Sequence, residues 1–88
     1  MAWTIEYTET ARRELRGLDR PAAREILHFM EQQAALLDDP RCLGVVLTEP
    51  LGDLWRYRVG GCRVICDVRD RLLRVLMARG SRRDQVYG

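Results

Sequence analysis

The stretch "LWRYRVGGCRVICDV", residues 54–68, determines the expected fold. Successive side chains of a β-strand point to opposite faces, so the beginning of this stretch places three apolar side chains on one face and two arginines on the other. The apolar residues are Trp55, Tyr57 and Val59, and the arginines are Arg56 and Arg58. The pair Gly60-Gly61 then favours a tight turn, after which the alternation resumes. The stretch therefore predicts an antiparallel hairpin with one core face and one basic face.

A third strand extends this hairpin into a sheet. In the strand after the turn, Arg63 and Ile65 share one face while cysteines and valines share the other, so Arg63 joins the first two arginines on the open face. The turn sequence "RDR" then leads into a last strand that ends at Arg79. We expect three antiparallel strands at residues 54–59, 62–68 and 72–79, with an arginine cluster on their uncovered face.

The N-terminal half predicts one strand and two helices. "AWTIEYT", residues 2–8, alternates apolar and polar side chains as a half-buried strand does. Thr8 or Thr10 can cap a first helix that runs to Gly17. Asp19 can cap a second helix, in which Pro21 occupies the first turn and an apolar stripe continues to Leu37, just before "DDP".

The remaining residues connect these elements. Residues 40–53 contain two prolines and two glycines, so we expect a loop that holds a short strand or turn at 45–47. The resulting order, β-α-α-β-β-β, predicts an α+β fold in which an N-terminal helical hairpin packs on one face of a small, mainly antiparallel sheet. The polar segment that follows Arg79 is expected to lie over the end of the sheet.

Length and composition limit the kind of site. With 88 residues, 47% of them hydrophobic and 32% charged, the chain fits a single globular domain spanning residues 1–88, with little room for a cofactor. No apolar run is long enough to cross a membrane and the N-terminus shows no leader pattern, so we expect a cytoplasmic protein that does not bind membranes. An open-faced site without a cofactor is therefore the better expectation.

The cysteines and the single histidine offer little chemistry. We expect Cys42, Cys62 and Cys66 to be buried thiols, because two cysteines four residues apart on one strand face lie about 13 Å apart, too far for a disulfide. His28 is the only histidine and is expected on the surface of the second helix, so a structural zinc site is disfavoured.

Positive charge is concentrated in the second half of the chain. Residues 1–44 contain six arginines and eight acidic residues, whereas residues 45–88 contain nine arginines and five acidic residues. Arginine binds phosphate through two parallel hydrogen bonds, and a phosphodiester of RNA supplies its own 2′-hydroxyl nucleophile. The expected cluster therefore fits RNA cleavage by positioning and charge stabilisation, with Tyr87 as the proton acceptor. Taken alone, however, exposed arginines on a sheet are more often a solvated surface or a protein-binding face.

The sequence resembles the RelE/ParE superfamily of bacterial type II toxins, closest to the RelE-like branch. The resemblance covers nearly the whole chain, and its most specific pieces are "LWRYRVG", the following "RVI" and the terminal "VY". It implies the fold expected above, a cognate RelB-like antitoxin, no metal or small-molecule cofactor, and ribosome-dependent cleavage of mRNA.

The resemblance also implies roles for individual residues. Arg56 and Arg58 match a basic pair that contacts the RNA backbone, Arg63 matches the arginine that holds the scissile phosphate, and Tyr87 matches a C-terminal general base. The further catalytic arginine of the family aligns with Ser81 by strict spacing, so Arg82 or Arg83 is expected to act there. Arg79 is expected to contribute to RNA binding.

Two other functions remain open. A ParE-like toxin of the same fold would inhibit DNA gyrase without RNase chemistry, and a catalytically weakened chain would serve only to bind the antitoxin. The chain has Gly61 and Cys62 where close relatives have Asp and Tyr, and Ser81 where a His is usual. These departures lie next to the expected site.

Overall fold

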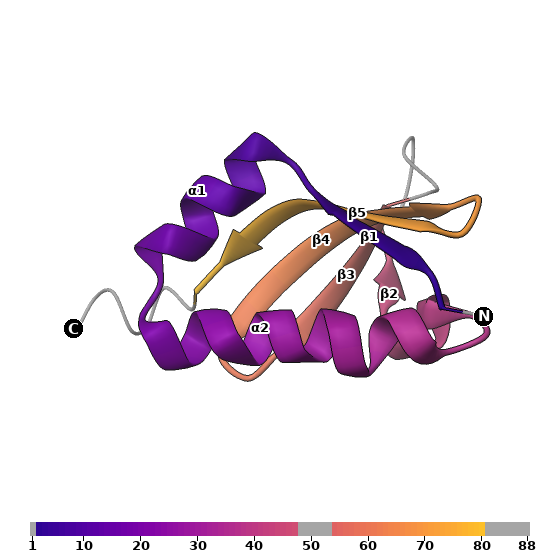
Figure 1. Ribbon diagram of the computed structural model, residues 1–88, viewed down its shortest axis with the longest axis horizontal. Helices are drawn as coiled ribbons and strands as arrows, with labels where there is room; N and C mark the ends of the chain where they lie inside the picture. Colours follow the sequence, from indigo (N-terminus) through magenta and orange to yellow (C-terminus); the bar gives the residue numbers. More distant parts are fainter. Residues whose placement is uncertain (1, 48–53, 81–88) are drawn as a thin grey trace.

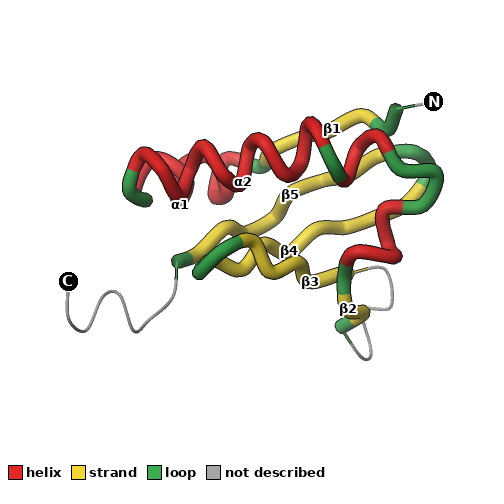
Figure 2. Tube along the Cα trace, turned by 90° about the horizontal axis from the view of Figure 1, so that it is seen from below, coloured by secondary structure: helices red, strands yellow, loops and turns green. Residues whose placement is uncertain are grey.

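The computed structural model describes residues 2–47 and 54–80, which form two helices on one face of a five-stranded sheet (Figures 1 and 2). In chain order the strands and α-helices are β1 (Thr4–Tyr7), α1 (Glu9–Gly17), α2 (Arg20–Gln32), β2 (Val45–Val46), β3 (Leu54–Val59), β4 (Cys62–Arg69) and β5 (Leu72–Arg79). Two short 3-10 helices, Ala34–Leu36 and Pro40–Leu43, lie between α2 and β2. The predicted α+β fold is confirmed.

The sheet has the order β1-β5-β4-β3-β2. β3, β4 and β5 form the two predicted antiparallel hairpins, and β2 adds a short antiparallel strand within the segment predicted to hold one. β1 pairs with β5 in parallel and forms one edge of the sheet, and β2 forms the other edge. This order places β4 at the centre, flanked by β3 and β5.

The core lies between the helices and one sheet face. Tyr57 and Val59 of β3 are buried and Trp55 is half-buried, as the alternation predicts. The β4 residues of the same face are also buried: Cys62, Val64, Cys66 and Val68. α1 packs mainly against β5, whereas α2 crosses over β3 and β4. Figure 2 shows that both helices lie on one side, which leaves the other face of the sheet uncovered.

α1 begins directly after β1, and its N-cap residue, Thr8, contacts β5. Thr8 caps the helix by accepting a hydrogen bond from Ala11 N–H at 3.1 Å. The same residue donates its own N–H to Val75 O at 3.0 Å and its hydroxyl to Leu76 O at 3.3 Å. Thr8, rather than Thr10, is therefore the cap, and it anchors α1 to the sheet.

The second helix is shorter than the apolar stripe predicts. α2 ends at Gln32, and Gln33 leaves helical geometry at φ −124° and ψ −67°. The next residues form a 3-10 turn, in which Ala35 O accepts a hydrogen bond from Trp3 N–H at 2.8 Å. A helix that ran to Leu37 would also leave the Ala35 carbonyl without an internal partner, so this contact accompanies the early end of α2 but does not explain it. Asp19 occupies the N-cap position of α2 without a side-chain capping bond.

One prediction about the cysteines is wrong. Cys62 and Cys66 are buried free thiols, but Cys42 is exposed. It lies in the 3-10 helix Pro40–Leu43, whose buried residue is Pro40, so the side chain of Cys42 faces away from the core. His28 is exposed on α2, as expected.

Candidate functional site

Three arginines form a row across the uncovered face of the sheet. Arg58 of β3 is the direct cross-strand partner of Arg63 of β4, and Arg63 is in turn the partner of Arg79 of β5. All three side chains are exposed. Directly opposed residues of antiparallel strands have Cβ atoms about 5 Å apart. The sheet therefore brings together three predicted site residues from three strands, here called the arginine row.

A β-bulge in β5 brings Arg79 to this face. Cys66 pairs with Val75, but Ile65 pairs with Met77, so Leu76 is an extra residue in β5. Before the bulge Val75 is buried, and after it Ala78 is buried and Arg79 exposed. Strict alternation from Val75 would turn Arg79 toward the core instead. The bulge therefore completes the arginine row.

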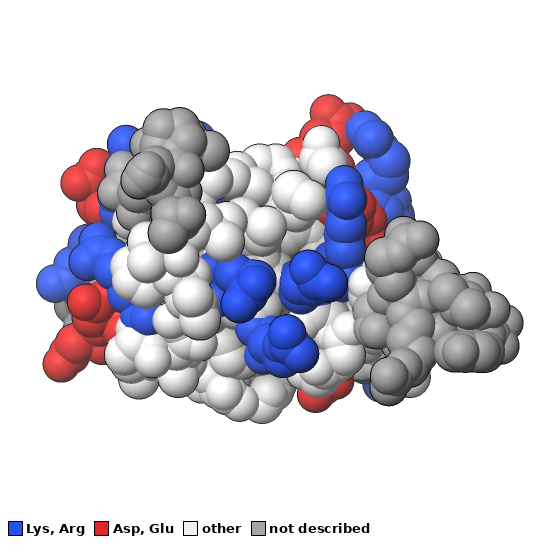
Figure 3. All heavy atoms as spheres, turned by 180° about the vertical axis from the view of Figure 1, so that it is seen from behind, with Lys and Arg blue, Asp and Glu red and all other residues white. Residues whose placement is uncertain are grey.

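Arg56 adds a fourth positive charge beside the row. It lies two residues before Arg58 on the same strand and is half-buried, with Ile65 and Val45 as its cross-strand partners. Within residues 2–47 and 54–80, no acidic side chain forms an ion pair with Arg56, Arg58 or Arg63. Figure 3 shows a group of basic side chains near the middle of this face. The centre of the face is therefore strongly positive.

The opposite end of the same face is electrically balanced. Arg74 of β5 binds Glu6 of β1, with Nε and Oε1 2.8 Å apart. Arg69 binds Asp67 through two hydrogen bonds of 3.1 and 3.0 Å. Among these arginines of the open face, the positive charge without an acidic partner in the described residues therefore lies at Arg56, Arg58 and Arg63, since Arg79 pairs with Glu14.

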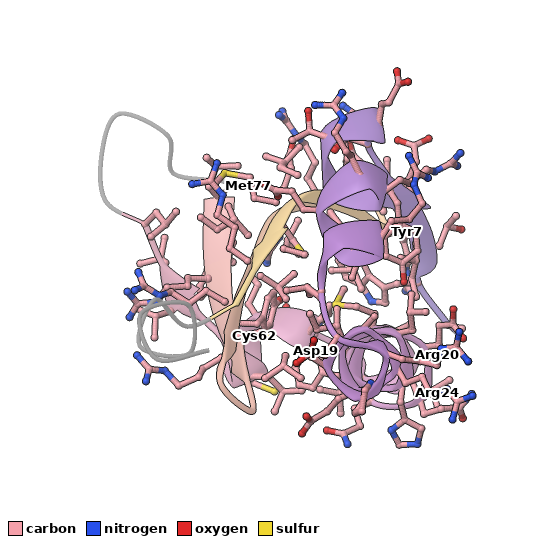
Figure 4. The ribbon with its side chains drawn as sticks, turned by 90° about the vertical axis from the view of Figure 1, so that its left-hand side faces the viewer. Tyr7, Asp19, Arg20, Arg24, Cys62 and Met77 are labelled. Carbon is pink, nitrogen blue, oxygen red and sulfur yellow. The ribbon has the colours of Figure 1, made fainter. Side chains whose placement is uncertain are left out.

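A hollow of about 510 Å³ lies beside the row, between β4, β5 and the end of α1. Its lining includes the apolar side chains of Leu18, Ile65 and Met77 and the charged side chains of Arg63, Arg79 and Glu14. Figure 4 shows Met77 on the side of the sheet away from Tyr7, and Arg20 and Arg24 pointing outward from α2. A hollow that combines apolar side chains with arginines can accept a ligand that has both an apolar part and an anionic part.

Of the charged residues that line this hollow, Glu14 is the one that the sequence analysis did not single out. Its carboxylate accepts hydrogen bonds from Ala78 N–H at 2.9 Å and from Arg79 Nε at 2.8 Å. Burial pushes the pKa of Glu14 upward, but these two hydrogen bonds and the charges of Arg79 and Arg13 outweigh it and hold the pKa below its ordinary value. A signal was present, because Glu14 follows the buried Ala11 by three residues and so shares its helix face.

The remaining predicted site residues, Arg82, Arg83 and Tyr87, lie outside the described residues. Within the described ranges no cluster of His, Cys, Asp or Glu side chains could hold a metal ion. The two α-helices described are also too short or too polar to cross a membrane.

Comparison with known proteins identifies the family. A family profile described as ParE toxin of type II toxin-antitoxin system, parDE, matches residues 5–86. The comparison with curated proteins found no match.

Solved structures share the fold. A chain of the toxin–antitoxin complex RelBE2 from Mycobacterium tuberculosis has a TM-score of 0.82 at 22% identity, over 91% of this chain and 99% of that chain. A mutant of the E. coli toxin RelE in the free state gives 0.72 at 19% identity, over 99% and 92%. The archaeal RelE–RelB complex from Pyrococcus horikoshii OT3 gives 0.69 at 24% identity, over 91% and 96%. The ParE toxin profile matches almost the whole chain, and the chain has the fold of the RelE structures. This protein therefore belongs to the RelE/ParE superfamily of type II toxins.

Proposed function

We propose that this toxin is a ribosome-dependent endoribonuclease that cleaves mRNA at the arginine row. The observation that supports this is the direct cross-strand opposition of Arg58, Arg63 and Arg79 on an uncovered face. Opposed like charges destabilise a sheet, and Arg58 and Arg63 have no acidic partner among the described residues, so a bound anion would stabilise this arrangement. Neighbouring phosphates of an RNA strand are anions that suit arginine in geometry and charge.

The proposed reaction uses no metal ion. The ribose 2′-hydroxyl attacks the adjacent phosphorus and the 5′-oxygen of the next nucleotide leaves, which forms a 2′,3′-cyclic phosphate. Tyr87 accepts the proton of the 2′-hydroxyl, and a water beside Arg82 or Arg83 protonates the leaving oxygen. Arg63 holds the phosphate and stabilises the charge that develops on it in the transition state.

The other arginines bind RNA on either side of the cleaved bond. Arg56 and Arg58 follow one another on the open face of β3 and are proposed to hold the backbone before the bond. Arg79, at the opposite end of the row, is proposed to contact the strand on the other side. Because these contacts are ionic, RNA binding should weaken steeply with salt.

We also propose that a RelB-like antitoxin inhibits the protein. The similar chains from M. tuberculosis and P. horikoshii come from complexes with RelB proteins. An acidic or amphipathic segment that folds on binding would suit either the arginine row or the helical face. The neighbouring reading frame should then restore growth and co-purify with the toxin; failure of both would contradict this part of the proposal.

Primer extension on a reporter mRNA tests the nuclease proposal. After brief induction, the proposal predicts new 5′ ends inside translated codons. The same message with its start codon removed is the matched control, because it has the same sequence but is not read by ribosomes. Equal cleavage of both messages would contradict ribosome dependence, and growth arrest with an intact message would contradict the nuclease proposal.

A second candidate function is inhibition of DNA gyrase. The matching family profile is that of ParE toxins, which is the observation in its favour. This alternative predicts an intact message, together with loss of gyrase supercoiling activity when purified toxin is added. Cleaved message with unaffected supercoiling would exclude it.

A further inference from the structure

Glu14 holds one end of the arginine row. Its Oε2 accepts a hydrogen bond from Arg79 Nε at 2.8 Å, and it belongs to α1, 65 residues away in the sequence. Building on the proposed function, we propose that Glu14 is a positioning residue that fixes the Arg79 guanidinium at the rim of the hollow, ready for an RNA phosphate. It does not touch the reacting atoms in this account.

The two partners differ in how firmly they are held. The Glu14 side chain is 20% exposed and is fixed by Ala78 N–H, a backbone donor of β5 beyond the end of β1. The Arg79 side chain is 64% exposed, and Glu14 is its one acidic partner among the described residues. The anchored carboxylate therefore orders the exposed arginine, and not the reverse.

The contact leaves the phosphate-binding end of Arg79 available. Glu14 uses Nε, so both terminal NH₂ groups of the guanidinium keep their donors for a ligand. An arginine side chain loses considerable rotamer freedom when it binds, and ordering it beforehand reduces that loss. The pKa of Glu14 is held below its ordinary value, so its carboxylate is charged at neutral pH and the contact with Arg79 needs no proton transfer.

The β-bulge and Glu14 act on the same short segment. Leu76 is the extra residue, Ala78 N–H bonds to Glu14, and Arg79 follows directly. Thr8, the N-cap residue of α1, bonds to the carbonyl of the bulge residue Leu76. Glu14, farther along the same helix, bonds to Ala78 and Arg79, which follow the bulge. α1 therefore determines where the end of β5 lies, and Glu14 is its contact with the functional side chain.

An opposite role would make the contrary prediction. If Glu14 served only to neutralise Arg79 and so to restrain RNA binding, then removal of its charge would increase cleavage. If Glu14 served only to cap the backbone of β5, an isosteric amide that still accepts from Ala78 N–H would leave cleavage unchanged.

Glu14→Gln separates these roles. The glutamine oxygen can still accept from Ala78 N–H, but its NH₂ group and Arg79 Nε are both donors. Glu9→Gln is the matched control, because it removes the same charge from an exposed residue of the same helix. In cleavage of the translated reporter mRNA by purified full-length protein, kcat/KM is expected to fall about tenfold for Glu14→Gln. The fall should come mainly from a higher KM, because Arg79 is proposed to bind the strand rather than the reacting atoms. Glu9→Gln is expected to match the wild type.

A double-mutant cycle with Arg79→Ala completes the test. If Glu14 acts through Arg79, then Glu14→Gln changes nothing further in the Arg79→Ala background. The inference would be overturned if Glu14→Gln lowered cleavage as much in the Arg79→Ala background as in the wild type. It would also be overturned if Glu14→Gln alone left cleavage unchanged or increased it.

A spectroscopic measurement distinguishes failure of this inference from failure of the proposed function. The Nε–Hε signal of Arg79, assigned with Arg79→Ala, should exchange slowly with solvent in the wild type and rapidly in Glu14→Gln. Rapid exchange in both proteins would overturn the inference even if the wild type cleaves RNA. Slow exchange that is lost in Glu14→Gln supports the positioning contact even if the wild type proves to be inactive on RNA.

Discussion

Two tyrosines allow a matched test of the core, because only one of them has a hydrogen-bond partner in the described structure. Tyr57 is fully buried and its hydroxyl donates to Pro40 O at 3.0 Å. Its ring packs against Phe29 with centroids 5.6 Å apart. The buried hydroxyl oxygen of Tyr7 has no partner among the described residues. The same change, Tyr→Phe, therefore removes a satisfied hydroxyl in one case and an unsatisfied one in the other.

The expected magnitudes follow from the hydrogen bond alone, since both rings are retained. Tyr57→Phe removes a net hydrogen bond and leaves the buried Pro40 carbonyl without this donor, so the free energy of unfolding should fall by about 1 to 2 kcal/mol. For a domain of this size each kcal/mol corresponds to roughly 4 to 8 °C in Tm. Tyr7→Phe relieves a buried polar group, so stability should stay the same or rise by about 1 kcal/mol.

Urea unfolding of the three proteins measures the difference. The midpoint should shift in opposite directions for the two variants, or down for Tyr57→Phe alone, with unchanged m-values. Equal destabilisation by both substitutions would refute the reasoning, because it would mean that the Pro40 contact contributes nothing specific.

The remaining predictions concern pH and two turns. Burial, assisted by nearby acidic groups, raises the pKa of Tyr7 and of Cys66 to about 12 and raises that of Tyr57 as well. The unfolded chain loses these protons first, so the free energy of unfolding should fall as the pH rises from about 9 toward 12. The fall is about 1.4 kcal/mol per pH unit for each group, once the pH exceeds the pKa of that group in the unfolded chain. A urea midpoint that stays flat between about pH 8 and 11 would contradict this. Gly60→Ala should lower the free energy of unfolding by about 1 to 2 kcal/mol, because Gly60 has φ +60° and a Cβ there would lie 2.7 Å from Glu25 Oε1. An unchanged thermal midpoint would count against this turn geometry. Asp70→Val should destabilise by about 1 to 2 kcal/mol, because Asp70 has φ of 53°, a conformation that β-branched residues rarely adopt. An unchanged midpoint in thermal unfolding would argue the reverse.

The strands β3 and β4 were predictable because each has one buried face. Tyr57 and Val59, then Cys62 and Val64, show the period of two that one-sided burial imposes. This alternation also placed Arg58 and Arg63 on the uncovered face. The pairing register follows from the short turn at Gly60, which has positive φ as a tight hairpin requires.

The bulge and the hydrogen-bond partners of Glu14 were not predictable from such patterns. Leu76 and Met77 are both apolar and both half-buried, so an extra residue leaves no mark in the alternation. Glu14 reaches Ala78 across 64 residues, a contact that only the packing of α1 on β5 creates. The hydrogen bond between Trp3 and Ala35 is likewise a contact between residues far apart in the sequence. Local sequence cannot show which carbonyl a remote strand will bind.

The most direct test of the central claim is Arg63→Ala, measured by primer extension on the translated reporter mRNA. Arg74→Ala is the matched control, because Arg74 is exposed on the same sheet but pairs with Glu6 outside the arginine row. Both variants should fold, as judged by circular dichroism and thermal unfolding. Loss of cleavage in Arg63→Ala, with cleavage retained in Arg74→Ala, is the result that the account predicts. Undiminished cleavage by folded Arg63→Ala would contradict it.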